Sequence, residues 1–457
     1  MRSNLPHVNR VRLIVAALVV LALGLRVWEV QRTSYTPTGD AGSYLALASG
    51  VAHTGDYSTR GGAGGSRGPT AYFPPAFPYF LAAVDLIDGH RTPRGGAVEP
   101  ARLAQAALGT ATVALTGLVA FEAFGVAIGL TSLAIAAVYP ALIELSGTVY
   151  AENLMIPLIL AAIWTALRAR RSDRPYRWVV AAGVLTGLAT LTHQNGIVVL
   201  LALLPAVWAI RRAPLLLVAL TALTIAPWTV RNAIVMNRFI PVSDETGLTL
   251  AGTYNPTSAH EKQIPYRWHD YKSIPADAAL RREAQKLTEP QVDSKYRSAA
   301  FHYIGHHPLS PLAVAYHNTR RLLELEGSFA WRASTYNIGV PRSTARVGVV
   351  GFWLVLVLAA FGAFTTAARR APRWLWITPV LLYLSVVFVN AETPRFRAPI
   401  DPFLIVLAGC ALATAVGRAR ARLVARSDRG APVGRDELGA PTAGSLSQLV
   451  EVVQGGA

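Results

Sequence analysis

The chain has 457 residues, of which 52% are hydrophobic and 15% are charged, and its formal net charge is +17. A soluble globular protein carries about 25% charged residues and a disordered chain has low hydrophobicity, so the composition excludes both classes. The single cysteine, Cys410, excludes an intramolecular disulfide and a thiolate metal cluster. We therefore expect a membrane protein.

Apolar runs recur along the chain, and a helix that spans a bilayer needs about 17–25 such residues. They predict an all-α polytopic membrane protein with about ten transmembrane helices, at 11–30, 101–121, 126–146, 153–168, 177–193, 196–210, 214–230, 347–367, 373–389 and 399–416. The segment 72–88 is short and contains three prolines and Asp85. We predict an interfacial helix there, and a further span remains the alternative.

Arginine clusters in the short connections between these runs and after the last one. The positive-inside rule places such connections in the cytoplasm, and ten spans with a cytoplasmic N-terminus satisfy it throughout. A nucleic-acid partner is not expected, because its binding needs basic residues gathered on one soluble face. The clusters are Arg168, Arg170, Arg171, Arg174 and Arg177; Arg211 and Arg212; Arg369, Arg370 and Arg373; and Arg418, Arg420, Arg422 and Arg426.

This topology divides the chain into seven parts. The Ala-, Arg- and Gly-rich composition indicates a bacterium, so we predict a multi-pass protein of the bacterial plasma (inner) membrane with both termini in the cytoplasm. The parts are a cytoplasmic N-terminus (1–10), the first transmembrane helix (11–30), a first extracytoplasmic loop (31–100), helices two to seven (101–231), a second large extracytoplasmic loop (232–346), helices eight to ten (347–416) and a cytoplasmic, mostly disordered tail (417–457).

Charged and polar residues gather at the outer ends of the predicted spans: Asp40, Glu152, His193, Arg231, Glu392, Arg395 and Arg397. Each of these residues also has an ordinary structural role as an alternative. An acid can cap a helix, an arginine can extend its charge to the membrane interface, and a histidine can occupy that interface without a catalytic role. Charges beside a membrane are nevertheless costly without a partner or a function. Because they share one face beside two long loops, they indicate an active site.

Five motifs carry a resemblance that covers about residues 10–418. Their order and spacing resemble the GT-C membrane glycosyltransferases, in particular the branch of protein O-mannosyltransferases and lipid A aminoarabinose transferases. The motifs are Thr38–Tyr44, the proline-rich Tyr72–Tyr79, Tyr150–Leu154, Ala226–Asn232 and Arg395–Pro402.

The resemblance implies an inverting glycosyltransferase that moves a sugar from a polyprenyl-phosphate donor to a hydroxyl acceptor on a protein, a lipid or a cell-envelope glycan. A carboxylate that deprotonates the hydroxyl and arginines that hold the phosphate suit this chemistry. Catalytic candidates are Asp40 and Glu152, candidates for the donor phosphate are His193, Arg231, Arg395 and Arg397, and candidates for substrate contact are Tyr44, Tyr72 and Asn255.

Use of a divalent cation, Mg²⁺ or Mn²⁺, stays open. Members of the family often have two adjacent acids in the first loop, whereas here Asp40 is followed by Ala41. Glu152 is the candidate metal ligand. A helix-like stretch at 296–326 contains four histidines, for which interfacial packing and metal binding are both readings.

The competing hypothesis is a lipid-linked glycan flippase. Transporters commonly show internal repeats and ionisable residues at mid-membrane depth. The chain shows no clear repeat, and its charges cluster at one face, so we favour the transferase. A non-catalytic membrane scaffold is the third reading.

Overall fold

The computed structural model describes residues 5–59, 68–89 and 98–430. The chain divides into two compact units, residues 1–413 and 414–457, and the account below concerns the first. In the part of the chain that the structure describes, all regular structure is helical apart from one antiparallel pair of two-residue strands, β1 (Ser58–Thr59) and β2 (Gly68–Pro69). The predicted all-α membrane fold is confirmed.

Each of the ten predicted spans is helical over most of its length. Among the described residues, six helices are long and apolar enough to cross a membrane, and the bent pair of α5 and α6 makes a seventh if counted as one span. The six are α1 (Leu5–Arg32), α4 (Val98–Phe124), α7 (Glu152–Ala169), α10 (Ala213–Val235), α17 (Arg342–Ala363) and α20 (Asp401–Gly430). The other predicted spans are shorter or less apolar helices: α8 (Pro175–Thr192), α9 (Val198–Val207) after the 3₁₀ turn η2 (Gln194–Ile197), and α19 (Arg373–Val387).

The bent pair, which corresponds to the predicted span 126–146, is broken at Pro140. There α5 (Val126–Val138) and α6 (Pro140–Ser146) meet at 54°. Proline has no N–H to donate to the carbonyl of Ala136, four residues earlier. Arg26 of α1, which is fully buried, donates to this carbonyl at 3.5 Å and to that of Ala137 at 3.3 Å. A guanidinium from the first span therefore satisfies backbone groups that the break leaves free.

The arginine-rich connections gather at one end of the bundle. Arg168, in the last turn of α7, and Arg171 pair with Glu122 near the end of α4, at 3.3 and 3.0 Å. The Tyr176 hydroxyl donates to the carbonyl of Arg211 at 2.9 Å, which joins two of these connections. Glu152 opens the same helix α7, so this acid and the arginines lie at opposite ends of one helix.

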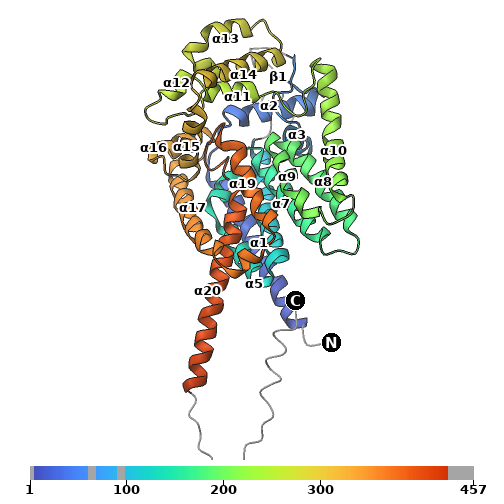
Figure 1. The fold of residues 1–457 in the computed structure, drawn as a ribbon, viewed down its shortest axis with the longest axis vertical. Coiled ribbons are helices and arrows are strands. Elements are labelled where there is room, and N and C mark those ends of the chain that lie inside the picture. The colour runs from blue at the N-terminus through green and yellow to red at the C-terminus, as the bar shows by residue number, and fades with distance from the viewer. Residues whose placement is uncertain (1–4, 60–67, 90–97, 431–457) are drawn as a thin grey trace, which may run out of the picture. The chain divides into compact units, whose positions relative to one another are not determined.

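The remaining helices, apart from α18, come from the two long loops. They are α2 (Gly39–Thr54), α3 (Ala76–Asp88), α11 (Thr246–Thr253), α12 (Pro256–Ala259), η3 (Tyr271–Ser273), η4 (Pro275–Asp277), α13 (Ala278–Ala284), α14 (Glu289–His306), α15 (Ser310–Leu322), α16 (Ser328–Asn337) and, at the arginine-rich end, α18 (Thr366–Arg370). Figure 1 shows α2, β1, α11, α13 and α14 gathered at the end of the bundle away from α5. The predicted helices at 72–88 and 296–326 correspond to α3 and to α14 with α15.

Direct contacts join the two loops. The carboxylate of Glu289 in α14 accepts hydrogen bonds from the Thr70 hydroxyl and the Ala71 amide, both at 2.7 Å. These residues follow β2 in the first loop. The two long segments therefore form one structure over the end of the bundle. The predicted tail begins as helix, because α20 runs to Gly430, and residues 431–457 lie outside the described part of the chain.

A buried ion network fastens this outer structure to the last span. Arg397 donates from Nη1 to Glu324 at 2.7 Å and from Nε to Asp401, the first residue of α20, at 3.2 Å. The Tyr139 hydroxyl donates to the other oxygen of Asp401 at 3.1 Å. All four side chains are buried, so each charge depends on its partners for compensation.

We predict that Glu324→Gln lowers the free energy of unfolding by about 3 kcal/mol, because it removes one counter-charge of a buried guanidinium. The measurement is thermal unfolding of the detergent-solubilised protein. Glu283→Gln is the matched control, since Glu283 pairs with Lys295 at an exposed position. A surface pair contributes about 0–1 kcal/mol, so an equal shift in both variants would contradict a special role for the network.

Candidate active site

A cavity of about 1660 Å³ lies among the elements of the outer structure and the ends of the membrane helices. Its walls come from α2, β1, the start of α11, the segment before η3, the end of α16 and the residues at and after the end of α19. Drug-sized ligands occupy pockets of about 300–1,000 Å³. The cavity is therefore large enough for two substrates together.

Arg395 joins two carboxylates at this cavity. Its Nη1 donates to Oδ2 of Asp40 at 2.7 Å, and its Nε donates to Oε1 of Glu152 at 2.6 Å. The rings of Tyr150 and Phe396 lie 4.5 and 4.8 Å from the guanidinium carbon, at cation–π distance. Three segments that are far apart in the sequence thus meet at one side chain.

The two carboxylates differ in access. The Asp40 side chain, in the first turn of α2, is 39% exposed and lines the cavity. The Glu152 side chain is 1% exposed and lines only a small adjoining pocket, which it shares with His193. Burial alone would lower the pKa of Arg395, but the charges of Glu152 and Asp40 raise it well above its ordinary value. A substrate in the cavity thus reaches Asp40, whereas Glu152 holds Arg395.

Two more of the predicted residues line the cavity. His193 follows the end of α8, and Tyr72 precedes the proline-rich segment before α3. The Nδ1 atom of His193 is buried and has no hydrogen-bond partner among the described residues. The structure thus brings together four predicted residues at the cavity, with Glu152 directly behind them.

The other predicted residues lie elsewhere. Arg231 donates to the carbonyls of Thr70 and Tyr57, at 2.7 and 3.2 Å, and Arg397 belongs to the buried network described above. Neither arginine is among the cavity's lining residues.

Neither of the remaining two side chains reaches the cavity. Tyr44 packs between Phe73 and Phe77, with ring centroids 4.7 and 5.0 Å away. Asn255 caps α12, and its amide donates to the carbonyls of Ala251 and Gly252. Both are absent from the cavity lining.

Two further acids line the cavity: Glu245, which the sequence analysis did not single out, and Glu392, which it grouped with the other charges without giving it a role. Glu245, just before α11, accepts a hydrogen bond from Gln194 at 3.2 Å, and Glu392 accepts one from Asn337 at 3.3 Å. Burial and the nearby charge of Asp40 raise the pKa of Glu245 to about 8. Burial also raises the pKa of Glu392. The sequence signal for Glu245 is the acidic pair Asp244–Glu245, fourteen residues after the end of the seventh predicted span at 214–230.

The donor set does not fit a divalent cation. A metal held by Asp40 and Glu152 would have to lie between them, and the guanidinium of Arg395 fills that position. Within residues 5–59, 68–89 and 98–430, no group of three or more His, Cys, Asp or Glu side chains is arranged to hold a metal ion.

Comparison with known proteins gives a match to a family model and to solved structures. The model for the family described as dolichyl-phosphate-mannose-protein mannosyltransferase matches residues 73–230. That range includes Glu152 and His193 but neither Asp40 nor Arg395. No curated protein matches the chain.

Solved structures match over most of the chain at low identity. ArnT from Cupriavidus metallidurans shares 15% identity over 89% of this chain and 77% of its own, with a TM-score of 0.41. The S. cerevisiae Pmt1–Pmt2 protein O-mannosyltransferase complex bound to its sugar donor shares 16% identity over 56% of this chain and 37% of its own, with a TM-score of 0.40.

A third match has a higher TM-score, 0.55. It is the archaeal oligosaccharyltransferase AglB from Archaeoglobus fulgidus, solved with an inhibitory peptide and a dolichol-phosphate, at 13% identity over 94% of this chain. This chain spans about half of that protein, since the match covers 52% of it. Together with the family model, this match confirms the prediction: the chain has the fold of the GT-C superfamily of membrane glycosyltransferases.

Proposed function

We propose that the protein is an inverting glycosyltransferase that moves a sugar from a polyprenyl-phosphate donor to a hydroxyl acceptor at the extracytoplasmic face of a bacterial plasma membrane. The observation that carries this proposal is the placement of Arg395 between Asp40 and Glu152 at a large cavity beside the membrane helices. This arrangement places a base for the acceptor hydroxyl, Asp40, beside a cation for the donor phosphate, Arg395.

In the proposed reaction the acceptor oxygen attacks the anomeric carbon of the donor sugar. The bond between that carbon and the phosphate oxygen breaks, and its electron pair stays with the phosphate. Asp40 takes the proton of the acceptor hydroxyl, because its carboxylate reaches the cavity. Arg395 stabilises the charge that grows on the leaving phosphate.

Arg395 also links donor binding to the state of Asp40. In the structure the guanidinium shares its Nη1 and Nε atoms between the two carboxylates. A phosphate that takes over the Nη1 donor frees Oδ2 of Asp40 to accept the hydroxyl proton. Glu152 stays buried and keeps Arg395 in position, so we assign it a positioning role.

The geometry offers the donor a route from the membrane. Ser385 and Val386 in α19, and Val389 and Asn390 just after it, line the cavity on the same side as Arg395 and Phe396. A polyprenyl chain in the bilayer can place its phosphate there without leaving the apolar phase. The arginine-rich connections lie at the opposite ends of the spans, which supports an extracytoplasmic site and cytoplasmic termini.

A lipid-linked glycan flippase is the alternative function. Its substrate would have to pass along the bundle, whereas the described cavity lies among the loop elements at one end. Sugar transfer at that end of the bundle agrees better with the position of the acids than transport along the bundle does. Turnover of the donor distinguishes the two functions.

We predict that Asp40→Asn reduces sugar transfer by about 10²–10⁴-fold, the usual contribution of a general base. The side chain is 39% exposed and Arg395 keeps Glu152 as its counter-ion, so the unfolding temperature should stay close to that of the wild type. Transfer from a panel of radiolabelled polyprenyl-phosphate sugars measures the loss. Asp173→Asn, at an exposed position in an arginine-rich connection, is the control. Equal transfer by wild type and Asp40→Asn would refute the role of Asp40.

We predict that Arg395→Lys raises the KM for the donor by roughly tenfold, because an ammonium group cannot contact Glu152 and a phosphate with the fixed geometry of a guanidinium. Arg231→Lys is the matched comparison, since Arg231 contacts backbone carbonyls away from the cavity. It should leave the donor KM unchanged. A rise in KM for Arg231→Lys alone would place the phosphate at the other arginine.

We predict that the donor KM of the wild type rises as the pH passes through about 8. Below this pH Glu245 is protonated and neutral, because burial and Asp40 raise its pKa to about 8. Above it a second negative charge faces the site that receives the phosphate. Glu245→Gln should abolish the rise, and a steady-state pH profile of both proteins measures it. The same rise in Glu245→Gln would assign the effect to another group.

A further inference from the structure

The cavity extends well beyond Asp40 and Arg395. It is lined by α2 from Asp40 to His53, which are thirteen residues apart in the chain, or about 20 Å at the rise of an α-helix. Asp56, Ser58 and Thr59 continue the lining past the end of α2. The donor phosphate accounts for the part beside Arg395. The rest of the cavity, which we name the long arm, has a length that suits an extended ligand.

The segment 268–272 forms another wall of this cavity, and it is held firmly in place. The amide of His269 donates to the carbonyl of Gly252 at 2.9 Å. The indole of Trp268 packs on Gly252, where a Cβ atom would come within 2.2 Å of the indole nitrogen. The aromatic ring therefore has a fixed position against α11.

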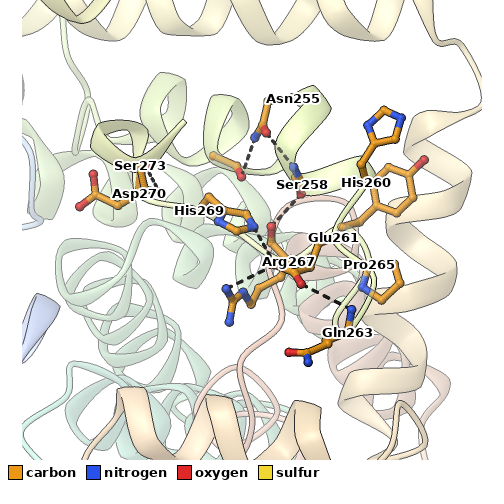
Figure 2. A network of polar contacts seen from close by, with 12 residues as sticks. Asn255, Ser258, His260, Glu261, Gln263, Pro265, Arg267, His269, Asp270 and Ser273 are labelled. Atoms are coloured by element: carbon orange, nitrogen blue, oxygen red, sulfur yellow. Dashed lines mark hydrogen bonds and ion pairs between the residues drawn. The ribbon is translucent and has the colours of Figure 1, made fainter. Parts of the chain in front are cut away.

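A polar network behind the segment supports it further. Figure 2 shows Glu261 between Arg267 and His269, each with a nitrogen 3.6 Å from a carboxylate oxygen. The Ser258 hydroxyl donates to the carbonyl of Arg267 at 2.7 Å, and Asp270 accepts from the amide of Lys272 at 2.8 Å. A wall that is ordered before a ligand arrives reduces the entropy lost on binding.

A histidine and an aspartate meet at the far end of α2. His53 lines the cavity, and its Nε2 atom lies 3.2 Å from the carboxylate of Asp85 in α3. Asp85 is 4% exposed, so the imidazole is held from behind by a buried acid. Its other nitrogen remains for a ligand, since no described residue bonds to it.

The chemistry of the long arm suits a sugar chain. The ring of Trp268 offers an apolar face, while Asp56 and Asp270 offer carboxylates that accept hydrogen bonds from hydroxyl groups. Lys272 also lines the arm, which therefore offers hydrogen-bond donors as well as acceptors to the hydroxyl groups of a sugar.

A peptide acceptor finds less support. Extended peptides commonly bind by adding a strand to a sheet edge. β1, the strand that lines the cavity, has two residues and already pairs with β2. We propose that the acceptor is a neutral or basic glycan of several sugars, which lies along α2 with its reacting hydroxyl at Asp40 and its further sugars against Asp56 and Trp268. This inference rests on the proposed function, which determines that the reacting end of the glycan lies at Asp40.

Direct binding tests the inference without any turnover. Full-length protein in detergent is titrated by calorimetry with linear neutral oligosaccharides of one to five sugars, built from mannose, glucose or arabinose. We expect the affinity for one series to increase with chain length. Asp56→Asn should weaken binding of its longest member by roughly tenfold, as the loss of a hydrogen bond to a charged group does. Lys272→Gln is a second variant in the long arm, and it should weaken the same member.

The exposed control Asp173→Asn should bind like the wild type. Affinity that does not depend on chain length in any series, or binding of serine- and threonine-containing peptides in place of glycans, would overturn the inference. Transfer of sugar from polyprenyl-phosphate donors to these oligosaccharides is measured separately. Its absence with every donor would count against the proposed function, while length-dependent glycan binding would still establish the long arm.

Discussion

The ion pairs of Arg395 are the constraint on which the site depends. Glu152 is almost completely buried, and a buried carboxylate is tolerated only with a partner. Its described partner is a guanidinium 243 residues later in the chain, which also holds Asp40 from the first loop. The connection between α19 and α20 must therefore meet α7 before this charge is compensated, and the same guanidinium then holds the first loop. Formation of the fold and formation of the active site are one event.

Much of the fold follows from the sequence, because each span is a local property of its own residues. Runs of about twenty apolar residues form helices wherever the lipid is the solvent, and arginine sets their direction. The same reasoning placed Asp40, His193 and Arg395 at one face, since each follows or precedes a span end. The comparisons confirm the fold superfamily, while the roles of these residues remain proposals.

The sequence could not distinguish arginines that occupy equivalent positions at span ends. Arg231 and Arg397 stand as near to the outer face as Arg395, yet carbonyl groups and buried acids surround them. What separates the three is the set of partners that long-range packing supplies. Glu245 escaped the sequence analysis for the same reason: it becomes a site residue only because the second loop folds back over Asp40. Contacts between segments far apart in the chain leave no pattern in the sequence around each residue.

The break at Pro140 has a consequence for how the protein is made. Arg26 lies in the first span, where a charged side chain is costly without partners. The carbonyls of Ala136 and Ala137 that receive it lie 110 and 111 residues later, so they do not yet exist when the first span leaves the ribosome. Within the first span the guanidinium donates to the carbonyl of Ala22 at 3.1 Å, so it enters the bilayer with only part of its hydrogen bonds. Synthesis of α5 and α6 supplies its partners, which makes the bent pair an assembly step in the biogenesis of the N-terminal helix.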